Sequence, residues 1–472
     1  MSAERLLAGD ATAMAEAVRA GECSVASLVQ ASLARIAATE GRVNAFTDVT
    51  ASRAFARAAA LDARLSQGRA DPVTALPLLG VPFAVKNLFD LKGLKTLAGS
   101  KIERDSTPAA RDALLVERME AAGAVLVGAL NMDEYAYGFT TENSHEGATH
   151  NPHDLSRVAG GSSGGSGAAV AAGQVPVTLG SDTNGSIRVP SSLCGIFGLK
   201  PTFGRLPRTR SYPFVASLDH LGPFARSARD LALCYDAMQG ADAHDPGCVR
   251  RAVEPTVPTL SRGASGLRIA TLGGHFHEQA GPDAREAVTR VARALGALRT
   301  VELPEAARAR AAAFLITQAE GSNLHLPDLK TRPQDFEPLS RDRFLAGALL
   351  PASWVVQAQR VRRWFALRAA ELFGEVDVLL APATPCVAPA IGTEWLDSNG
   401  QRLPARPSLG LLTQPISCIG LPVCAVPVWG VHATLPIGVQ VIAAPWREDL
   451  VLRVAHALEA AGVVRAPVAT LD

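Results

Sequence analysis

Short apolar runs that alternate with segments of helical spacing constrain the fold of this chain more than any other feature. Strand-like runs lie at 76–88, 124–130, 267–272, 376–382, 421–428 and 437–443. Runs of this length without polar alternation are typical of strands that are buried on both faces of a sheet. Helical spacing is found at 4–66, 111–122, 282–296, 305–320, 341–373 and 449–461. The order predicts an α/β fold with a mixed central sheet that helices cover on both faces.

The length of 472 residues allows about three domains at roughly 150 residues each, although large α/β enzymes often form one unit. We find no internal repeat and no long linker. The weakest connection is 240–266, which contains several Pro, Gly and Asp residues. We therefore predict a single domain over 1–472, with a helical N-terminal region at about 1–68.

The composition excludes several classes of protein. Hydrophobic residues make up 48% and charged residues 19%, a globular balance that argues against wholesale disorder. The 46 Lys and Arg residues nearly cancel the 45 Asp and Glu residues, so we expect no nucleic-acid partner. No apolar run is long enough for a membrane span, and the charged N-terminus does not resemble a signal peptide. Seven scattered cysteines without a C-x-x-C pair favour reduced thiols and a cytoplasmic location.

The Gly- and Ser-rich segment at 157–205 is the most unusual part of the sequence. It contains GGSSGGSG followed at once by AAVAAG and VPVTLG. A flexible linker should not continue directly into small apolar residues that suit a tightly packed helix. A phosphate loop is also disfavoured, because G-K-[ST] and a strand-linked G-x-G-x-x-G are both missing.

Two kinds of serine nucleophile remain open from the residues alone. Gly160–Gly164 matches G-x-S-x-G, as does the frame centred on Ser163, and an α/β-hydrolase would then need a downstream histidine such as His432 or His456. The other kind uses a lysine base. Only six lysines occur, and Lys86 stands in the apolar run LLGVPFAVKNL. Desolvation there would lower the pKa of Lys86 and make a neutral amine available, which no arginine can offer.

Long ordered segments of the chain resemble the amidase signature family of serine amidohydrolases. They are PLLGVPFAVKNLFDLKGLKTLAGS (77–100), GALNMDEYAYGFTTENSHEGATHNPHDLSRVAGGSSGGSGAAVAAG (128–173), GSDTNGSIRVPSSLCGIFGLKPTFGRL (180–206) and LPIGVQVIA (435–443). The similarity is densest over 77–206, which we take as the signature core. The resemblance implies the amidase signature fold and hydrolysis of the C–N bond of linear amides. We expect no cofactor and no metal.

The resemblance also implies a Ser-Ser-Lys triad. Ser186 would be the nucleophile, Ser162 the bridging serine at a cis peptide bond, and Lys86 the base. Backbone N–H groups of a glycine-containing turn would stabilise the oxyanion, namely those of Thr183, Asn184, Gly185 and Ser186. Supporting roles fall to Ser163, Asp182 and Arg188. Many family members have Gly in place of Asn184; Asn tolerates left-handed backbone, and its side chain would narrow the pocket.

Further residues are candidates for other roles. Lys200 is an alternative base, although GLKPT is more typical of a structural strand end. His145, His150 and His153 raise the question of a zinc site, but HEGATH is one residue too long for H-E-x-x-H, so they are candidates for the pocket entrance instead. The candidate substrate-binding residues are Met132, Tyr137, Arg341, Arg343 and Gln414.

Within the family, GSDTNGSIRVPSSLCG and the segments 216–240 and 341–354 are most similar to the biuret/carboxybiuret hydrolase-like branch of s-triazine degradation. This similarity implies a small urea-like amide substrate, release of ammonia, self-association and a small helical adaptor subunit. An anionic carboxybiuret would need Arg or Tyr for its carboxylate, and Tyr137, Arg341 and Arg343 are the candidates. The alternatives are a glutamine-dependent amidotransferase A-like subunit or a broad-specificity amidase. A non-catalytic subunit is disfavoured, because Lys86, Ser162 and Ser186 are all present.

Overall fold

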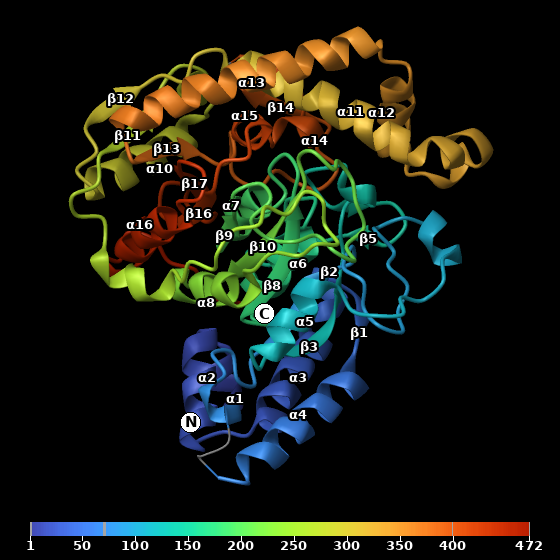
Figure 1. Ribbon diagram of the computed structural model, residues 1–472, viewed down its shortest axis with the longest axis vertical. Helices are drawn as coiled ribbons and strands as arrows, with labels where there is room; N and C mark the ends of the chain where they lie inside the picture. The colour runs from blue at the N-terminus through green and yellow to red at the C-terminus, as the bar shows by residue number, and fades with distance from the viewer. Residues whose placement is uncertain (1, 69–71, 399, 472) are drawn as a thin grey trace.

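The computed structural model describes residues 2–68, 72–398 and 400–471, and one 11-stranded sheet runs through it (Figure 1). The strand order is β1-β3-β2-β8-β10-β9-β16-β17-β13-β11-β12. These strands are β1 (Phe46–Val49), β2 (Pro82–Lys86), β3 (Val125–Leu130), β8 (Val177–Asp182), β9 (Phe197–Lys200), β10 (His220–Ala225), β11 (Ile269–Leu272), β12 (Arg299–Val301), β13 (Val378–Pro382), β16 (Val423–Val428) and β17 (Ile437–Ala443). Three two-stranded ribbons complete the set: β4 (Glu142–Asn143) with β5 (Gly147–Ala148), β6 (His150–Asn151) with β7 (Asp154–Val158), and β14 (Trp395–Ser398) with β15 (Gln401–Pro404).

The sheet is mixed, as predicted. Strands β3, β2 and β8 run parallel to one another, and so do β13, β11 and β12. The strands between these groups pair antiparallel, and β1 is antiparallel to β3 at the outer edge. Because β2 and β8 are parallel neighbours, their carboxyl ends meet at one edge, and this is where the candidate site lies.

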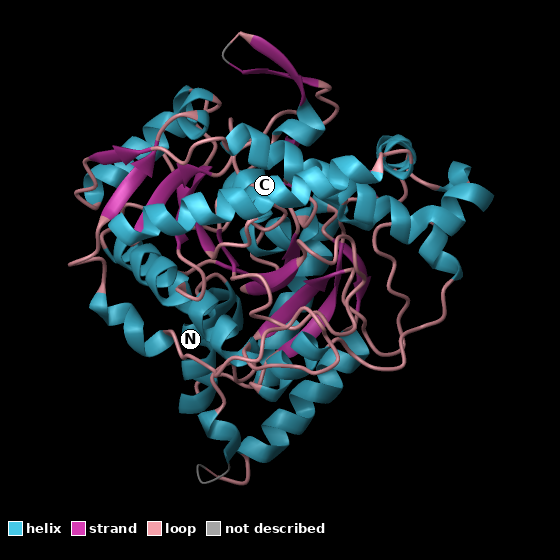
Figure 2. Ribbon diagram, turned by 45° about the horizontal axis from the view of Figure 1, so that its top comes forward, coloured by secondary structure: helices cyan, strands magenta, loops and turns pink. Residues whose placement is uncertain are grey.

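Helices cover both faces of the sheet (Figure 2). α6 and α7 contact each other and the central strands, as do α8 and α16. α1 to α4 form the N-terminal end of the molecule, while α11 to α13 lie across the opposite end (Figure 1). The helices are α1 (Ala3–Leu7), α2 (Ala11–Ala20), α3 (Val25–Val43), α4 (Ala51–Leu65), α5 (Leu114–Ala121), α6 (Gly164–Ala171), α7 (Arg188–Cys194), α8 (Ala228–Met238), α9 (His275–Glu278), α10 (Pro282–Ala294), α11 (Ala306–Thr331), α12 (Pro338–Ala348), α13 (Ala352–Glu375), α14 (Ala405–Ser408), α15 (Gln414–Cys418) and α16 (Glu448–Ala460). Short 3-10 helices lie at η1 (Pro72–Ala75), η2 (Ile102–Asp105), η3 (Glu134–Ala136), η4 (Val257–Arg262) and η5 (Pro333–Asp335).

The predicted helix at 341–373 is two helices in the structure. α12 ends at Ala348 and α13 begins at Ala352, with Pro351 between them. Proline lacks a backbone N–H and disfavours helical backbone in the residue before it, so the chain turns here. The strands β1, β8, β10 and β12 were not predicted. β1 corrects the helical spacing predicted over 4–66, because a strand lies between α3 and α4. Polar residues or a Gly-Pro pair interrupt the apolar runs of β8 and β10.

The Gly- and Ser-rich segment is packed inside the protein. Every residue of α6 is buried, and the helix lies against β2, β8 and β10. A side chain at Gly161 would overlap the carboxylate of Asp133, and one at Gly165 would overlap the backbone of Asn131. The glycines therefore permit close backbone packing, which is the opposite of a linker's function.

No helix in the described part of the chain is both long and apolar enough to cross a bilayer. The prediction of a single domain over 1–472 stays a prediction.

Candidate active site

Lys86 is the last residue of β2, and its side chain is fully buried. Its Nζ donates hydrogen bonds to Ser162 Oγ at 2.7 Å and to Ser181 Oγ at 2.9 Å. Ser181 lies near the end of β8, whose residues Val177–Leu179 pair in parallel with Phe83–Val85 of β2. The parallel pairing therefore carries Ser181 to the amine.

Ser162 reaches Lys86 from the turn that precedes α6. The Gly161–Ser162 peptide bond is cis, as the family resemblance implied. The carbonyl of Ser162 accepts a hydrogen bond from the backbone N–H of Asp133 at 3.2 Å. The neighbouring Ser163 donates from Oγ to the carbonyl of Ser181 at 3.1 Å. Ser162 therefore contacts Lys86 at the end of β2, and Ser163 contacts the end of β8.

Burial lowers the pKa of Lys86 to about 7. Desolvation is the largest cause, because it disfavours the ammonium form. The negative charges of Asp133, Asp219 and Asp182 oppose this effect and raise the pKa of Lys86. A substantial share of neutral amine is thus present near neutral pH, which is what a general base requires.

Ser186 lies in the turn between β8 and α7. The positive φ in this turn is at Gly185, with φ of 143°. Asn184 does not adopt the left-handed backbone that an asparagine tolerates. A side chain at Gly185 would overlap Thr413, whose Oγ1 donates to the carbonyl of Asn184 at 2.7 Å. Glycine is required at this position both for its backbone conformation and for space.

The backbone N–H groups of residues 183 to 186 have no acceptor among the residues that the structure describes. The next N–H, that of Ile187, is bound by the carboxylate of Asp182 at 3.1 Å. Buried backbone donors are nearly always paired, so a run of unpaired ones beside a serine hydroxyl is a ready site for an anionic oxygen.

Asp182 and Arg188 hold the turn from inside. Arg188 donates from Nε and Nη2 to the two carboxylate oxygens of Asp182 at 3.0 Å each, and both side chains are fully buried. Arg188 also donates to the carbonyl of Thr413 at 3.0 Å, to Gln440 Oε1 at 2.7 Å and to Ser417 Oγ. Burial alone would raise the pKa of Asp182, but the charge of Arg188 and its hydrogen bonds hold that pKa well below its usual range. The ion pair of Asp182 and Arg188 therefore fixes the turn between β8 and α7.

A small cavity opens beside Ser186, and several predicted substrate residues meet there. Its lining comes from the nucleophile turn, η3 and the loop after it, the segment before β10, α11, α12 and α15. The residues are Thr183, Asn184, Ser186, Ala136, Tyr137, Gly138, Phe139, Phe214, Phe314, Thr317, Arg343 and Gln414. Asn184 narrows the cavity as expected and donates from Nδ2 to Thr317 Oγ1 at 2.8 Å. The Arg343 guanidinium lies 3.6 Å from the centroid of the Tyr137 ring.

Two predicted substrate residues do not line this cavity. Met132 is buried in the main hydrophobic core. Arg341 lies at the protein surface, where its Nε contacts Asp342 at 2.9 Å. The structure therefore favours Arg343 over Arg341, because the two side chains leave α12 in different directions.

The three histidines of the central segment lie apart from Ser186 and do not line its cavity. His145 Nε2 contacts Glu134 at 3.2 Å, His150 Nδ1 contacts the carbonyl of Leu155, and His153 Nε2 contacts the carbonyl of Cys194. The described residues contain no group of three or more His, Cys, Asp or Glu side chains that could hold a metal ion. The pocket-entrance hypothesis for these histidines is therefore not supported.

The α/β-hydrolase alternative lacks its histidine in this structure. His432 is on a partly exposed bend, where its Nδ1 accepts from the backbone of Thr434. His456 is on α16, with Glu459 4.0 Å away. Ser162 and Ser163 instead bind Lys86 and the end of β8.

Sequence reasoning missed residues that complete the site. Ser181 binds Lys86, Thr413 binds the nucleophile turn, and Thr317 binds Asn184. Asp219 accepts from Thr183 Oγ1 at 2.6 Å and from two backbone N–H groups. Only Ser181 had a signal, since it lies five residues before Ser186 within the segment 180–206 that resembles the family.

Comparison with known proteins agrees with this geometry. The family model described as Amidase matches residues 27–452. The chain belongs to the amidase family. It is accordingly a hydrolase of amide C–N bonds, and the predicted family and fold are confirmed.

Individual relatives of this amidase are similar over nearly their whole length. AtzE of Pseudomonas sp. (strain ADP), which is a 1-carboxybiuret hydrolase subunit, is 58% identical over 95% of this chain and 98% of its own. The A-type component of the glutamyl-tRNA(Gln) amidotransferase of Roseiflexus sp. (strain RS-1) is 39% identical over 94% of both chains. A solved chain from a vestigial protein complex that reveals the origins of an s-triazine catabolic enzyme matches with a TM-score of 0.95 and 58% identity, over 97% of this chain and 99% of that one.

Proposed function

We propose that this amidase releases ammonia from a small, anionic, urea-like amide of the carboxybiuret type, with Ser186 as nucleophile and Lys86 as base. The observation that carries the proposed chemistry is the contact of the buried amine of Lys86 with Ser162. A neutral lysine beside a serine hydroxyl is an activated pair that needs no histidine and no metal.

The reaction begins with transfer of two protons. Neutral Lys86 takes the proton of Ser162, and Ser162 takes that of Ser186, while Ser186 Oγ attacks the amide carbonyl. The negative charge that develops on the carbonyl oxygen is stabilised by the unpaired N–H groups of residues 183 to 186. The relay then returns a proton to the leaving nitrogen, and ammonia departs from an acyl-enzyme. Water attacks the acyl-enzyme carbonyl with the same relay as base, and Ser186 is restored.

Arg343 supports an anionic substrate. Its guanidinium borders the cavity of Ser186, and the described residues offer it no carboxylate partner. Burial lowers the pKa of Arg343, and the charge of Asp133 opposes this effect. No carboxylate of the described residues forms an ion pair with the guanidinium. A substrate carboxylate would supply the missing charge and accept charge-assisted hydrogen bonds. Gln414, oriented by Arg310 through a 2.8 Å hydrogen bond, is positioned on the same cavity for a neutral amide group.

The test is a panel of ammonia-release assays on carboxybiuret, biuret, allophanate, glutamine and simple aliphatic amides. We expect the highest kcat/KM on carboxybiuret and a large decrease on biuret, which lacks the carboxylate. Preference for glutamine would favour the amidotransferase A-like alternative, and equal rates on all amides would favour a broad amidase.

We also propose that the chain self-associates in the cytoplasm and works with a small helical adaptor subunit. Exposed apolar side chains concentrate on α13 and on the turn before it, where Leu349, Trp354, Val356 and Leu367 are each more than half exposed. All seven cysteines are free thiols, which suits a reducing compartment. Light scattering of the purified chain, alone and co-expressed with a candidate adaptor, would show a homo-oligomer and a heteromeric complex respectively; a monomer in both samples would refute this proposal.

A further inference from the structure

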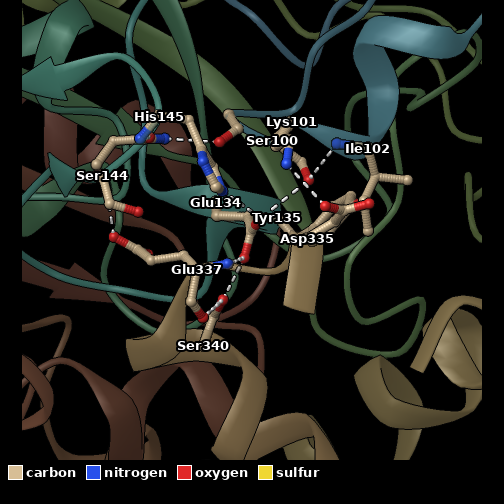
Figure 3. A network of polar contacts seen from close by, with 12 residues as sticks. Ser100, Lys101, Ile102, Glu134, Tyr135, Ser144, His145, Asp335, Glu337 and Ser340 are labelled. Carbon is tan, nitrogen blue, oxygen red and sulfur yellow. Dashed lines mark hydrogen bonds and ion pairs between the residues drawn. The ribbon is translucent and has the colours of Figure 1, made fainter. Parts of the chain in front are cut away.

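Glu134 is a fully buried carboxylate that binds three separate segments of the chain (Figure 3). Its Oε1 accepts from Ser100 Oγ at 2.9 Å and contacts His145 Nε2 at 3.2 Å. Its Oε2 accepts from the backbone N–H of Glu337 at 2.8 Å and from Ser340 Oγ. The last two donors belong to the first turn of α12, so this carboxylate attaches that helix to the core.

The position of the carboxylate suits the beginning of a helix. The first N–H groups of a helix have no partner within the helix, and the N-terminus attracts negative charge. Glu134 satisfies one of these N–H groups and one side-chain hydroxyl of the same turn. Glu337 extends the attachment, since its carboxylate accepts from Arg406 at 2.8 Å and from the backbone N–H of Ser144 at 3.2 Å.

α12 packs closely on α11, and the polar attachment at its first turn adds to this packing. Only Ser340, Phe344 and Gly347 of its residues are buried, whereas Leu339 is 55% exposed and Leu345 40%. Phe344 packs among the rings of Tyr137, Phe214 and His325. Ser322 of α11 donates from Oγ to the carbonyl of Phe344 at 2.6 Å, so the packing on α11 and the polar attachment at the first turn together set the position of α12.

Arg343 depends on this constraint, because it lies one turn beyond Ser340 on the same helix. Its Nη1 donates to the carbonyl of Tyr137 at 3.0 Å, and its guanidinium lies over the Tyr137 ring at the wall of the Ser186 cavity. Tyr137 follows Glu134 by three residues. The short segment 134–137 thus contacts α12 twice. Glu134 binds the beginning of the helix, and Tyr137 binds the guanidinium of Arg343.

We propose that Glu134 and Ser340 are positioning residues that set α12 so that Arg343 meets the carboxylate of the substrate. The inference rests on the proposed role of Arg343 in substrate recognition. Neither Glu134 nor Ser340 lines the Ser186 cavity, so they act through Arg343 and determine specificity for an anionic over a neutral amide.

The experiment is a double-mutant cycle with Ser340→Ala and Arg343→Met, assayed on carboxybiuret and on biuret. Arg343→Met should raise KM for carboxybiuret roughly 10- to 150-fold, the range for loss of a hydrogen bond to a charged group. Ser340→Ala should raise that KM about three- to tenfold, less because Arg343 is displaced and not removed. In both variants kcat on carboxybiuret should change by less than about threefold, and KM for biuret should rise much less than KM for carboxybiuret, as expected when mainly binding of the carboxylate is lost.

Coupling between the two sites decides the inference. If Ser340 acts through Arg343, then Ser340→Ala has no further effect on KM in the Arg343→Met background. If the two substitutions raise KM for carboxybiuret additively, or if Ser340→Ala raises KM for biuret equally, the positioning role of Ser340 is overturned. The proposed role of Arg343 would not be affected by either result. If Arg343→Met keeps the preference for carboxybiuret, the proposed substrate recognition itself is wrong, and the positioning role fails with it.

Three further variants serve as controls. Arg341→Met removes an arginine of the same helix that faces solvent, and it should leave both substrates unaffected. Ser340→Thr keeps the hydroxyl and should restore most of the KM for carboxybiuret. Glu134→Gln removes the charge at the shared acceptor and should raise KM in the same selective way, with thermal unfolding used to verify that the variant is folded. A folded Glu134→Gln variant with unchanged KM would contradict the proposal.

Discussion

The pH dependence of this amidase should respond to Ser181, a residue that is not one of the three triad members. Lys86 Nζ donates to Ser181 Oγ at 2.9 Å, and Ser181→Ala removes this acceptor. A hydrogen bond to a charged group contributes about 1.5–3 kcal/mol and one between neutral groups about 0.5–1.5 kcal/mol. The substitution therefore destabilises the ammonium form more than the neutral amine, by roughly 1–1.5 kcal/mol.

This difference corresponds to roughly one pKa unit, since about 1.4 kcal/mol shifts a pKa by one unit. The pKa of Lys86 is about 7 in the folded protein and should decrease to roughly 6 in the variant. Because neutral Lys86 is the active form, ammonia release rises as pH increases through this pKa. The rising limb of kcat/KM against pH should accordingly move to lower pH by roughly one unit.

The assay is ammonia release on carboxybiuret across roughly two pH units on either side of the midpoint. The matched control is Ser166→Ala, which removes another buried hydroxyl, one that donates to the carbonyl of Leu179 at 3.1 Å. For Ser166→Ala, the rising limb of kcat/KM against pH should lie at the same pH as in the unmodified protein. A limb that stays in place, or moves to higher pH, in Ser181→Ala would refute the assignment of Lys86 as the titrating base.

Three further outcomes are expected. Ser186→Ala and Lys86→Ala should each lower kcat by on the order of 10⁴-fold or more, while circular dichroism shows that both variants stay folded. The control Lys92→Ala, at an exposed lysine, should be fully active, and an active Ser186→Ala variant would refute the triad. Arg188→Met should decrease the free energy of unfolding by about 3–5 kcal/mol in urea titrations, because it leaves the carboxylate of Asp182 buried without its partner, while Arg251→Met at the surface should leave the midpoint nearly unchanged. A comparable loss in both would contradict this account. Treatment with a metal chelator should leave activity unchanged, whereas a loss that added zinc restores would revive the metal hypothesis.

Much of the fold could be predicted because its main strands are short and apolar. β11, β13, β16 and β17 lie within the predicted runs 267–272, 376–382, 421–428 and 437–443. β8 and β10 escaped prediction, since Thr178 and Ser181 interrupt the apolar run of β8 and the Gly222-Pro223 pair in β10 is typical of a turn. The order of strands in the sheet depends on contacts between distant segments, and no local pattern contains that information.

The substrate side of the site was less predictable from sequence, and Arg341 and Arg343 show why. Two residues along a helix are separated by about 200° around its axis, so one arginine borders the cavity while the other meets solvent. The apolar residues of α12 do not identify its inner face, because Leu339 and Leu345 are exposed and a phenylalanine, Phe344, is the buried large side chain. Only the tertiary structure distinguishes the two arginines.

Lys200 shows that burial alone does not make a lysine a base. It is as fully buried as Lys86, and burial lowers its pKa to about 7 as well. The sequence context GLKPT favours a structural strand end, and Lys200 is the last residue of β9. Its Nζ, however, donates to the backbone carbonyls of Pro201 and Leu421. A carbonyl accepts a hydrogen bond but has no proton to give, whereas the hydroxyl of Ser162 beside Lys86 has one. The chemistry therefore depends on the partner of the amine, and β9 ends in a structural lysine while β2 ends in one that can serve as a base.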